Sequence, residues 1–534
     1  MDRRDFLMAA GGATTGELLG LAPDAARKPE AEALLLAATE GGKVDKKSAR
    51  PSLEHSLAAY AVGVRYADLP REIVAATKRL LLDTLACAFG AVGAQPAKIA
   101  EATFRKAYGG GTAASVIGGG MISTEGAALV NGVLVRYLDF NDTYVGSEPL
   151  HPGEIVPLAL ACCEEAGGSG RALVEALVVG YEGETRINDA FTFLDRGFHP
   201  LSAAGFVAPM VAGKAWQLPP GQIAQAIGIS GTRELTMFVV NSGEISMMKA
   251  LGHAYTCMDA VFSTRLAQAG FTGPSGTIEW LTTRVGPKHA DVRINLDPGA
   301  YRLTRVFLKR FPLQFEMQAA VEACVNLHPA VRGGTDGIRE VVIETYPRIR
   351  ERTAGPEKYQ STTRESADHS LPICTAMALL DGDVNKSQFD RDRWRDRDVM
   401  ALAAKTTVKV GESLVARMPK GRGAAVEVRL GDGRVLKEAI DIPEGDVERP
   451  LSRAALERKF RQLAVPLLGE AGATQVIALV DNLENVEDVR AFTKALRDMR
   501  PKNPRHSREA CPRESGERNS MFCGATAGSP RSRE

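Results

Sequence analysis

Apolar residues recur at helical spacing through almost half of the chain, from residue 53 to 308. Positions i, i+3, i+4 and i+7 are apolar in each of the segments 71–91, 124–140, 170–191 and 245–270. Several of these segments are apolar nearly all round, which is typical of central helices in a large bundle. A chain of 534 residues is long enough for two or three domains. The sequence therefore predicts a large all-helical domain over 53–308.

The residue pattern changes after position 308. Four segments are rich in β-branched residues or alternate in polarity, as strands do: 338–346, 406–410, 424–430 and 434–440. Gly431-Asp432-Gly433 separates the last two segments and is a hairpin signal. Helical patterns at 315–327 and 370–381 lie between the strands. We therefore predict a smaller α+β domain over 309–447, followed by helices over 448–499 that return to the first domain. The predicted fold class is mainly α.

The two ends of the chain differ from the rest. Arg3-Arg4, followed by Phe6-Leu7 and small residues, resembles a twin-arginine export signal over 1–26, which predicts a periplasmic location; a cytoplasmic location is the alternative. Residues 27–52 are expected to form a linker. The segment 500–534 is rich in Arg, Ser, Gly and Pro, so we expect it to be disordered. Beyond the first segment, no run of about 18 apolar residues predicts a transmembrane helix.

Charge and motifs exclude several classes of protein. The 66 basic and 65 acidic residues nearly cancel, so no nucleic-acid or membrane partner is expected. The eight cysteines contain no Cys-x-x-Cys spacing, and no His-Glu-x-x-His motif occurs. Residues 109–120 are glycine-rich but lack the Lys-Ser/Thr of a phosphate-binding loop, so we assign them to a loop. We expect neither a metal nor an organic cofactor.

The stretch DFNDTYVGSEPLHPGE (139–154) gathers polar residues directly after an apolar helical run. If the helix continues through Asp139, Asp142 and Thr143, the three side chains share one face. Pro152 would hold the His151 imidazole on a restrained backbone. A carboxylate near a histidine orients the ring and raises its basicity, as a general base requires. The alternative is a helix cap followed by a loop histidine.

Other candidates have similar polar surroundings. Lys249 and His253 are four residues apart in an otherwise apolar helix, which would place two potential cations on one face. Lys309 and Arg310 stand at the start of the α+β domain and suit a clamp on a carboxylate, or a solvated basic patch. His199 lies in GFHPLSAAG and His369 lies in ESADHSLP.

Together these stretches resemble the MmgE/PrpD family, which contains 2-methylcitrate dehydratases, cis-aconitate decarboxylases and iminodisuccinate epimerases. The resembling segments are YLDFNDT, HPGEIVPLALACCEEAG, VVGYEGETRI, GFHPLSAAG, AGFTGP, RFPLQFEMQAAVEA and TTRESADHSLPICTAMALLDGDV. The resemblance implies a helical domain with an α+β lid, a homodimer, and catalysis without a metal or organic cofactor. It also implies which residues line the active cleft: Asp139, Thr143, His151, His199, Lys249 and Lys309, with Asp368 and His369 in the ADHSLP segment.

The resemblance also implies a reaction. The chain departs from the decarboxylase branch at the spacing of His253 and at Gln314 and Ile373, so dehydration of a di- or tricarboxylate is the expected activity. The alternatives are epimerisation of a succinate- or aspartate-like acid, cis-aconitate-type decarboxylation, and ligand binding without catalysis. We expect His151 to act as the base, oriented by Asp139, and His199 as the acid, although the two roles are exchangeable. Lys249 completes the catalytic set. The expected substrate-binding residues are Thr143, Lys309, Arg310, His369, Asp142 and His253.

Overall fold

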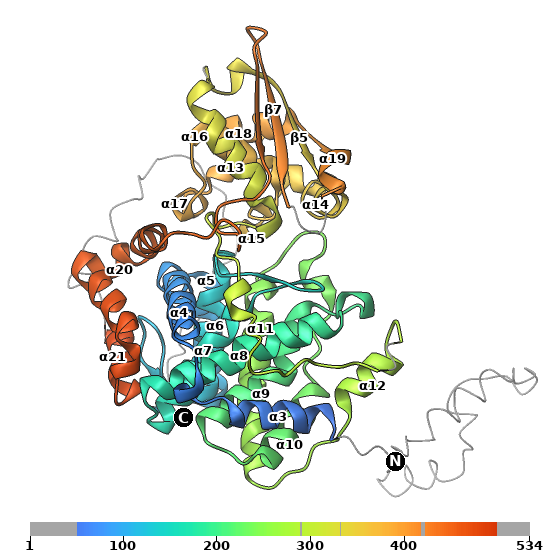
Figure 1. Ribbon diagram of the computed structural model, residues 1–534. Helices are drawn as coiled ribbons and strands as arrows, with labels where there is room; N and C mark the ends of the chain where they lie inside the picture. Colours follow the sequence, from blue (N-terminus) through green and yellow to red (C-terminus); the bar gives the residue numbers. More distant parts are fainter. Residues whose placement is uncertain (1–50, 289–290, 332, 418–421, 499–534) are drawn as a thin grey trace, which may run out of the picture. The chain divides into compact units, whose positions relative to one another are not determined.

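The computed structural model of the protein describes residues 51–498, apart from 289–290, 332 and 418–421 (Figure 1). The predicted export signal at 1–26, nearly all of the predicted linker and the predicted disordered tail at 500–534 lie outside the described residues. The export signal and the periplasmic location therefore stay predictions, and so does the homodimer, because the structure contains a single chain.

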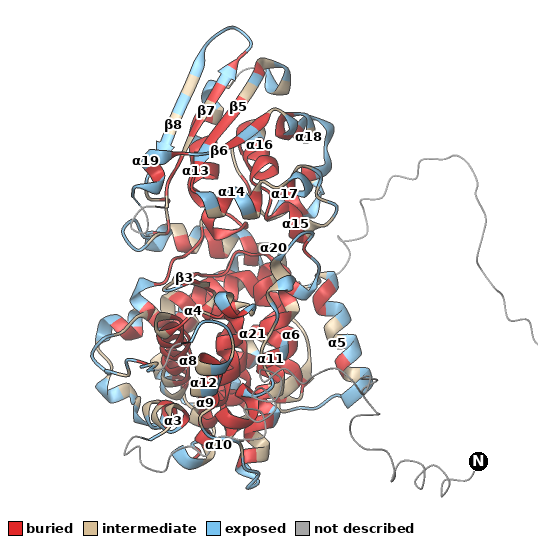
Figure 2. Cartoon of the chain, turned by 90° about the vertical axis from the view of Figure 1, so that its right-hand side faces the viewer, coloured by how far each residue is buried: buried red, intermediate tan, exposed pale blue. Residues whose placement is uncertain are grey.

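The first domain is built from helices, which pack against one another around α11. The four predicted helices correspond to α4 (Arg71–Ala91), α6 (Thr124–Tyr137), α8 (Gly170–Ala190) and α11 (Met248–Gln268). The remaining helices of this domain are α3 (Leu53–Gly63), α5 (Gln95–Tyr108), α7 (Val156–Ala166), α9 (Ala204–Ala215), α10 (Pro220–Gly231) and α12 (Thr277–Arg284). Figure 2 shows that the central helices of this domain are largely buried, as expected for helices that are apolar on nearly every side.

The predicted fold class, mainly α with a smaller α+β domain, is confirmed, and the helical domain also contains two small antiparallel hairpins. The first pairs β1 (Ala114–Ser115) with β2 (Met121–Ile122), within and just after the glycine-rich segment that we assigned to a loop. The second pairs β3 (Tyr144–Val145) with β4 (Pro149–Leu150) and carries the chain from Thr143 to His151. Each strand has only two residues, which is too short to produce a detectable alternation of polarity.

The second domain contains a four-stranded sheet with the order β6-β5-β7-β8. β5 (Ile338–Thr345) is parallel to β6 (Thr406–Val410) and antiparallel to β7 (Ala424–Leu430), which forms the predicted hairpin with β8 (Val435–Ile440). Buried residues alternate along β7, as in a sheet with one covered face. The helices of this domain are α13 (Gln318–Leu327), α14 (Pro347–Thr353), α15 (Arg364–Ala367), α16 (Leu371–Asp381), α17 (Lys386–Asp390), α18 (Arg397–Ala404) and α19 (Glu412–Val415). α13 packs against both β7 and β8.

The chain then returns to the first domain through α20 (Arg453–Asp481) and α21 (Val489–Asp498). α20 packs on α4, and the Nζ atom of Lys459 lies 2.6 Å from a carboxylate oxygen of the buried Asp83. The first hydrophobic core accordingly draws on residues 57–308 and 451–496, whereas the second core draws on 311–430.

α20 is long and apolar enough to cross a membrane by length and composition, and so are α4 and α5 together, as a pair bent by 86°. The backbone of Gly469 is not helical, however, with φ 68° and ψ 170°. It divides α20 into two parts that are each shorter than the roughly 20 residues a bilayer requires. α4 is buried along most of its length in the first core.

A close approach of Gly170, in the first domain, to the returning segment gives a test of this packing. A Cβ atom on Gly170 would lie 1.7 Å from the carbonyl oxygen of Leu483, and the Gly170 N–H donates to the carbonyl of Val486. We expect Gly170→Ala to lower the free energy of unfolding by about 2–3 kcal/mol, because backbone must move. Gly221→Ala is the matched control, since nothing lies within 4 Å of its added Cβ. Urea unfolding of both variants measures the difference, and equal stability would contradict the described packing.

Candidate active site

The helix that leads into the 139–154 stretch ends earlier than predicted. α6 stops at Tyr137, and Asp139 adopts a left-handed backbone conformation with φ 51°. Asp139, Asp142 and Thr143 therefore do not share a helical face, because a left-handed residue ends the right-handed helix. Thr143 instead forms a short antiparallel bridge with Phe307, at the end of the first domain. This bridge fixes the stretch beside the start of the second domain.

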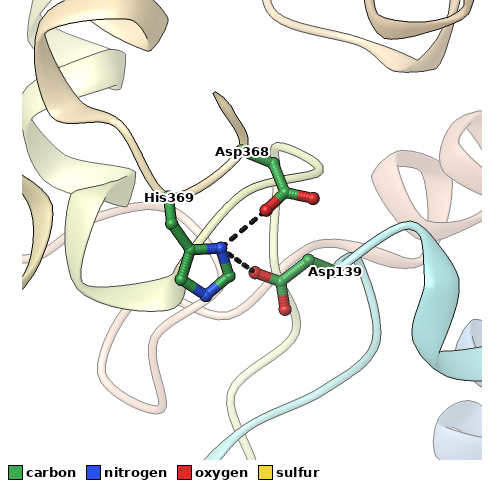
Figure 3. Close-up of side chains that lie close together, drawn as sticks. All are labelled: Asp139, Asp368 and His369. Atoms are coloured by element: carbon green, nitrogen blue, oxygen red, sulfur yellow. Dashed lines mark hydrogen bonds and ion pairs between the residues drawn. The ribbon is translucent and has the colours of Figure 1, made fainter. Parts of the chain in front are cut away.

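Asp139 is the centre of a buried cluster of charges. Its carboxylate pairs with Arg136, and one of its oxygens lies 3.0 Å from the Nζ atom of Lys309. The other oxygen lies 3.6 Å from Lys249 Nζ. Figure 3 shows the same carboxylate beside His369, whose Nδ1 atom lies 3.7 Å from that oxygen. Burial alone would raise the pKa of Asp139, but Arg136, Lys249 and Lys309 outweigh it and hold the pKa well below its usual value. Asp139 is thus ionised and balances several cations.

His151 is oriented by the backbone and not by the Asp139 carboxylate, which corrects the prediction. Its Nδ1 atom lies 2.7 Å from the carbonyl oxygen of Asp142 and 3.2 Å from Thr143 Oγ1. A carbonyl oxygen only accepts hydrogen bonds, so Nδ1 carries the proton and Nε2 carries the lone pair. Burial, followed by the charges of Arg136 and Lys309, lowers the pKa of His151 well below its usual value. The ring is therefore a neutral imidazole with Nε2 as its basic atom.

His199 is held as the opposite tautomer. Its Nδ1 atom accepts a hydrogen bond from the backbone N–H of Leu201, at 3.2 Å, so the proton of the neutral ring is on Nε2. The ring stacks on Phe238, with 5.9 Å between the ring centroids. Burial, together with the charge of Arg136, lowers the pKa of His199 to about 3. His151 and His199 therefore offer a lone pair and an N–H group, respectively.

Lys249 links α11 to the second domain. Its Nζ atom lies 2.8 Å from Asp368 Oδ1, and the same oxygen lies 2.6 Å from His369 Nδ1. Burial, together with the charge of Lys249, lowers the pKa of His369 to about 4. Asp139, Asp368 and His369 are close enough to one another to hold a metal ion. The ammonium group of Lys249 contacts all three of them, so a metal ion would compete with a cation that the chain itself supplies.

His253 lies on the same face of α11 as Lys249, as predicted, but its polar atoms are used by the protein. Its Nε2 atom lies 2.9 Å from a carboxylate oxygen of Glu184, and its Nδ1 atom lies 3.4 Å from Cys257 Sγ. Burial raises the pKa of Glu184 well above its usual value. His253 lines the inner cavity, and its role in substrate binding stays a prediction, although Glu184 and Cys257 already contact its ring nitrogens.

Four other predicted ligand-binding residues are not among the lining residues of the two cavities at His151 and His199, and their polar groups contact other groups of the protein. Arg310 pairs with Glu444 and Glu322, and Lys309 donates to the carbonyl and carboxylate oxygens of Asp139. Asp142 accepts from Tyr181 Oη and Gly153 N, while Thr143 contacts His151. Burial raises the pKa of Asp142 to about 7 and lowers that of Lys309 to about 8. These residues form the support of the site, since ordered side chains hold the cavity-lining groups in place.

Two cavities meet at the two histidines. The inner one is lined by Lys249, His253 and Glu154. The outer one is lined by residues of both domains, among them Asp139, His369, Gln314, Arg348 and Arg352. Both cavities are lined by Arg136, His151, His199, Pro200 and Asn241. A small ligand in this space would contact basic side chains and both histidines.

Sequence reasoning missed five polar residues of this region, among them Asn241, which lines both cavities. Arg136 lies one helical turn before Asp139 and bridges it to Glu154, a spacing that the sequence does display. Glu184 lies in an apolar helix and became recognisable only through its contact with His253. Arg348 and Arg352 follow β5 in the second domain, and no local pattern places them opposite His199.

Comparison with known proteins relates the whole arrangement to one family. Residues 55–283 match the MmgE/PrpD N-terminal domain, and residues 311–485 match the MmgE/PrpD C-terminal domain. A cis-aconitate decarboxylase from Aspergillus terreus is 24% identical over 84% of this chain and 96% of its own length. The cis-aconitate decarboxylase from Homo sapiens is 25% identical over 86% of this chain and 98% of its own length. A 2-methylcitrate dehydratase from Cupriavidus necator is 25% identical over 66% of this chain and 74% of its own length.

The cluster around Asp139 predicts a large loss of stability on neutralisation. We expect Asp139→Asn to lower the free energy of unfolding by about 3–5 kcal/mol, because it leaves three buried cations with too little negative charge. Asparagine tolerates the left-handed backbone, so the loss of stability measures the effect of removing the negative charge and not of straining the turn. Asp195→Asn is the control, since that carboxylate is exposed. Chemical unfolding at pH 7 measures both variants, and an Asp139→Asn chain as stable as the control would contradict the cluster's role.

The low pKa of His199 predicts a pH dependence of stability. Between pH 6.5 and about 3 the unfolded chain binds a proton at this residue and the folded chain does not, so His199 destabilises the fold as pH falls. We expect the stability of the natural chain, relative to that of His199→Gln, to fall by about 1.4 kcal/mol per pH unit below pH 6. Urea unfolding of both chains between pH 7 and 4.5 checks this. Parallel pH curves would show that His199 is not held neutral.

Proposed function

Because the chain belongs to the MmgE/PrpD family, we propose that it is a lyase that removes water from a 2-methylcitrate-like polycarboxylate. The observation that carries this proposal is the opposite tautomer of the two cavity histidines. Dehydration needs a base for a proton next to a carboxylate and an acid for the departing hydroxyl group. His151 Nε2 offers the lone pair and His199 Nε2 offers the N–H group, in adjoining cavities.

The proposed step keeps atoms and electrons in balance. His151 Nε2 takes the proton from the carbon next to a carboxylate, and the electrons of that C–H bond form the double bond. The C–O bond to the neighbouring carbon breaks, and the oxygen takes a proton from His199 and leaves as water. With its pKa at about 3, His199 is neutral in the empty site. The neutral ring gives the proton of its Nε2–H group to the leaving oxygen, and the proton that His151 has taken restores it after the water has left.

The substrate carboxylates need cations, and the cavity walls contain them. Arg136 lines both cavities and Lys249 lines the inner one. Both are already paired with Asp139, Glu154 or Asp368, so they are ordered before the substrate arrives. Ordered cations stabilise developing charge better than mobile ones, since no reorganisation is needed during the reaction. Asp139 and Lys309 act through these groups, as positioning residues.

Decarboxylation is the second candidate, and one observation favours it. The decarboxylase from Aspergillus terreus aligns with 84% of this chain, against 66% for the dehydratase from Cupriavidus necator. A decarboxylase breaks a C–C bond and then protonates the carbon, so it needs a proton donor but no base. The base-competent tautomer of His151 therefore supports dehydration over decarboxylation.

The proposal predicts different products for each reaction. With 2-methylcitrate or citrate as substrate, we expect an alkene that absorbs in the ultraviolet, formed without release of CO₂. Release of CO₂ from cis-aconitate would instead establish the decarboxylase. Exchange of a substrate C–H for deuterium from the solvent, without an alkene, would establish an epimerase. Absence of all three, with the ligands bound, would overturn the proposed catalysis.

His151 provides the decisive variant. We expect His151→Asn to fold with little change in melting temperature and to reduce kcat by about 10²–10⁴, the usual contribution of a positioned acid–base group. His55→Asn is the control, because His55 is exposed and hydrogen-bonded only to Ser52 among the described residues. If the melting temperature falls while turnover per folded molecule stays the same, His151 has a structural role and the proposed base is wrong.

A further inference from the structure

Two arginines of the second domain face the cavity from the side opposite the helical domain. Arg348 and Arg352 are four residues apart in α14, so they lie on one face of this short helix, and both line the outer cavity. Arg350, between them, is exposed and is absent from the cavity lining. None of the roles proposed above uses either arginine.

The hydrogen-bonding groups of these arginines are not fully used by the protein. The Nη2 atom of Arg348 is buried and has no hydrogen-bond partner among the described residues. The nearest carboxylate is Glu316, 3.5 Å from Arg348 Nε and 3.7 Å from Arg352 Nη1, beyond good hydrogen-bond distance. Glu148 attracts Arg348 electrostatically, but its oxygens accept from the backbone N–H groups of Phe193 and Leu194. Two guanidinium groups thus share one loosely bound carboxylate.

Arg352 is connected to the reacting region through an aromatic side chain. Its guanidinium carbon lies 5.6 Å from the centre of the Phe238 ring, and Phe238 stacks on His199. This contact holds Arg352 beside the histidine without using its N–H groups. A buried N–H group without an acceptor is costly, and a carboxylate that accepts two parallel hydrogen bonds is its best partner.

We propose that Arg348 and Arg352 form a subsite for a terminal carboxylate of the substrate. This inference rests on the proposed function, since it concerns the same cavity. The inner carboxylates contact Arg136 and Lys249, and the terminal carboxylate reaches across to α14 of the second domain. The site accordingly selects acids that place a third, terminal carboxylate in this subsite, and it discriminates against acids that have a methyl group in place of that terminal carboxymethyl group.

Tricarballylate and methylsuccinate provide a matched pair of probes. Methylsuccinate is tricarballylate without one terminal carboxylate, and neither acid has a hydroxyl group to eliminate, so both report equilibrium binding. In calorimetric titrations of the full chain at constant ionic strength, we expect tricarballylate to bind about 10- to 100-fold more tightly. In Arg348→Gln and Arg352→Gln, this preference should fall to a few-fold, with the Kd of methylsuccinate unchanged. Arg350→Gln should retain the full preference.

Each other outcome identifies what is wrong. If Arg348→Gln and Arg352→Gln retain the full preference for tricarballylate, the subsite is overturned while the polycarboxylate site stands. Equal losses for both acids would also overturn it, because they would indicate a general electrostatic or folding effect; thermal melts of the variants identify the folding effect. If the natural chain binds neither acid, nor 2-methylcitrate or citrate, the proposed function fails together with the subsite.

Discussion

The neutralisation of Asp139 by Arg136, Lys249 and Lys309 is the interaction on which the rest of the site depends. Each cation comes from a different segment: the end of α6, the start of α11, and the junction between the two domains. Isolated buried charges are prohibitively costly, so these segments gain stability only when they meet at one carboxylate. Burial, reinforced by the charge of Arg136, lowers the pKa of both His151 and His199 and keeps the two rings neutral.

The fold was largely predictable because its signals are local. A helical repeat of apolar residues predicts α4, α6, α8 and α11, and the glycines at its turn predict the β7–β8 hairpin. The hairpins β1–β2 and β3–β4 were not predictable, because two-residue strands show no repeat. The end of α6 was also misplaced, since an aspartate in the left-handed conformation has no distinct signature in a single sequence.

The site was predictable by residue type more than by role. His151, His199, Lys249 and His369 do line the cavities, but the expected partner of His151 was wrong. The carbonyl oxygen of Asp142 orients the His151 ring. Every residue has such a carbonyl group, so the sequence does not indicate which one the ring contacts. Contacts between the domains, such as those of Arg348 and Arg352, depend on how two separately folded cores meet, and residue spacing contains no record of this.

The left-handed backbone of Asp139 also limits how this site can evolve. Among charged side chains, only aspartate adopts that conformation readily, so glutamate would keep the charge and strain the turn. Asparagine and glycine would keep the turn and lose the charge. Every replacement loses either the unstrained left-handed backbone or the negative charge. A protein that loses the carboxylate must therefore first lose some of the cations that the carboxylate neutralises. Variation at position 139 should therefore be accompanied by changes at 136, 249 or 309.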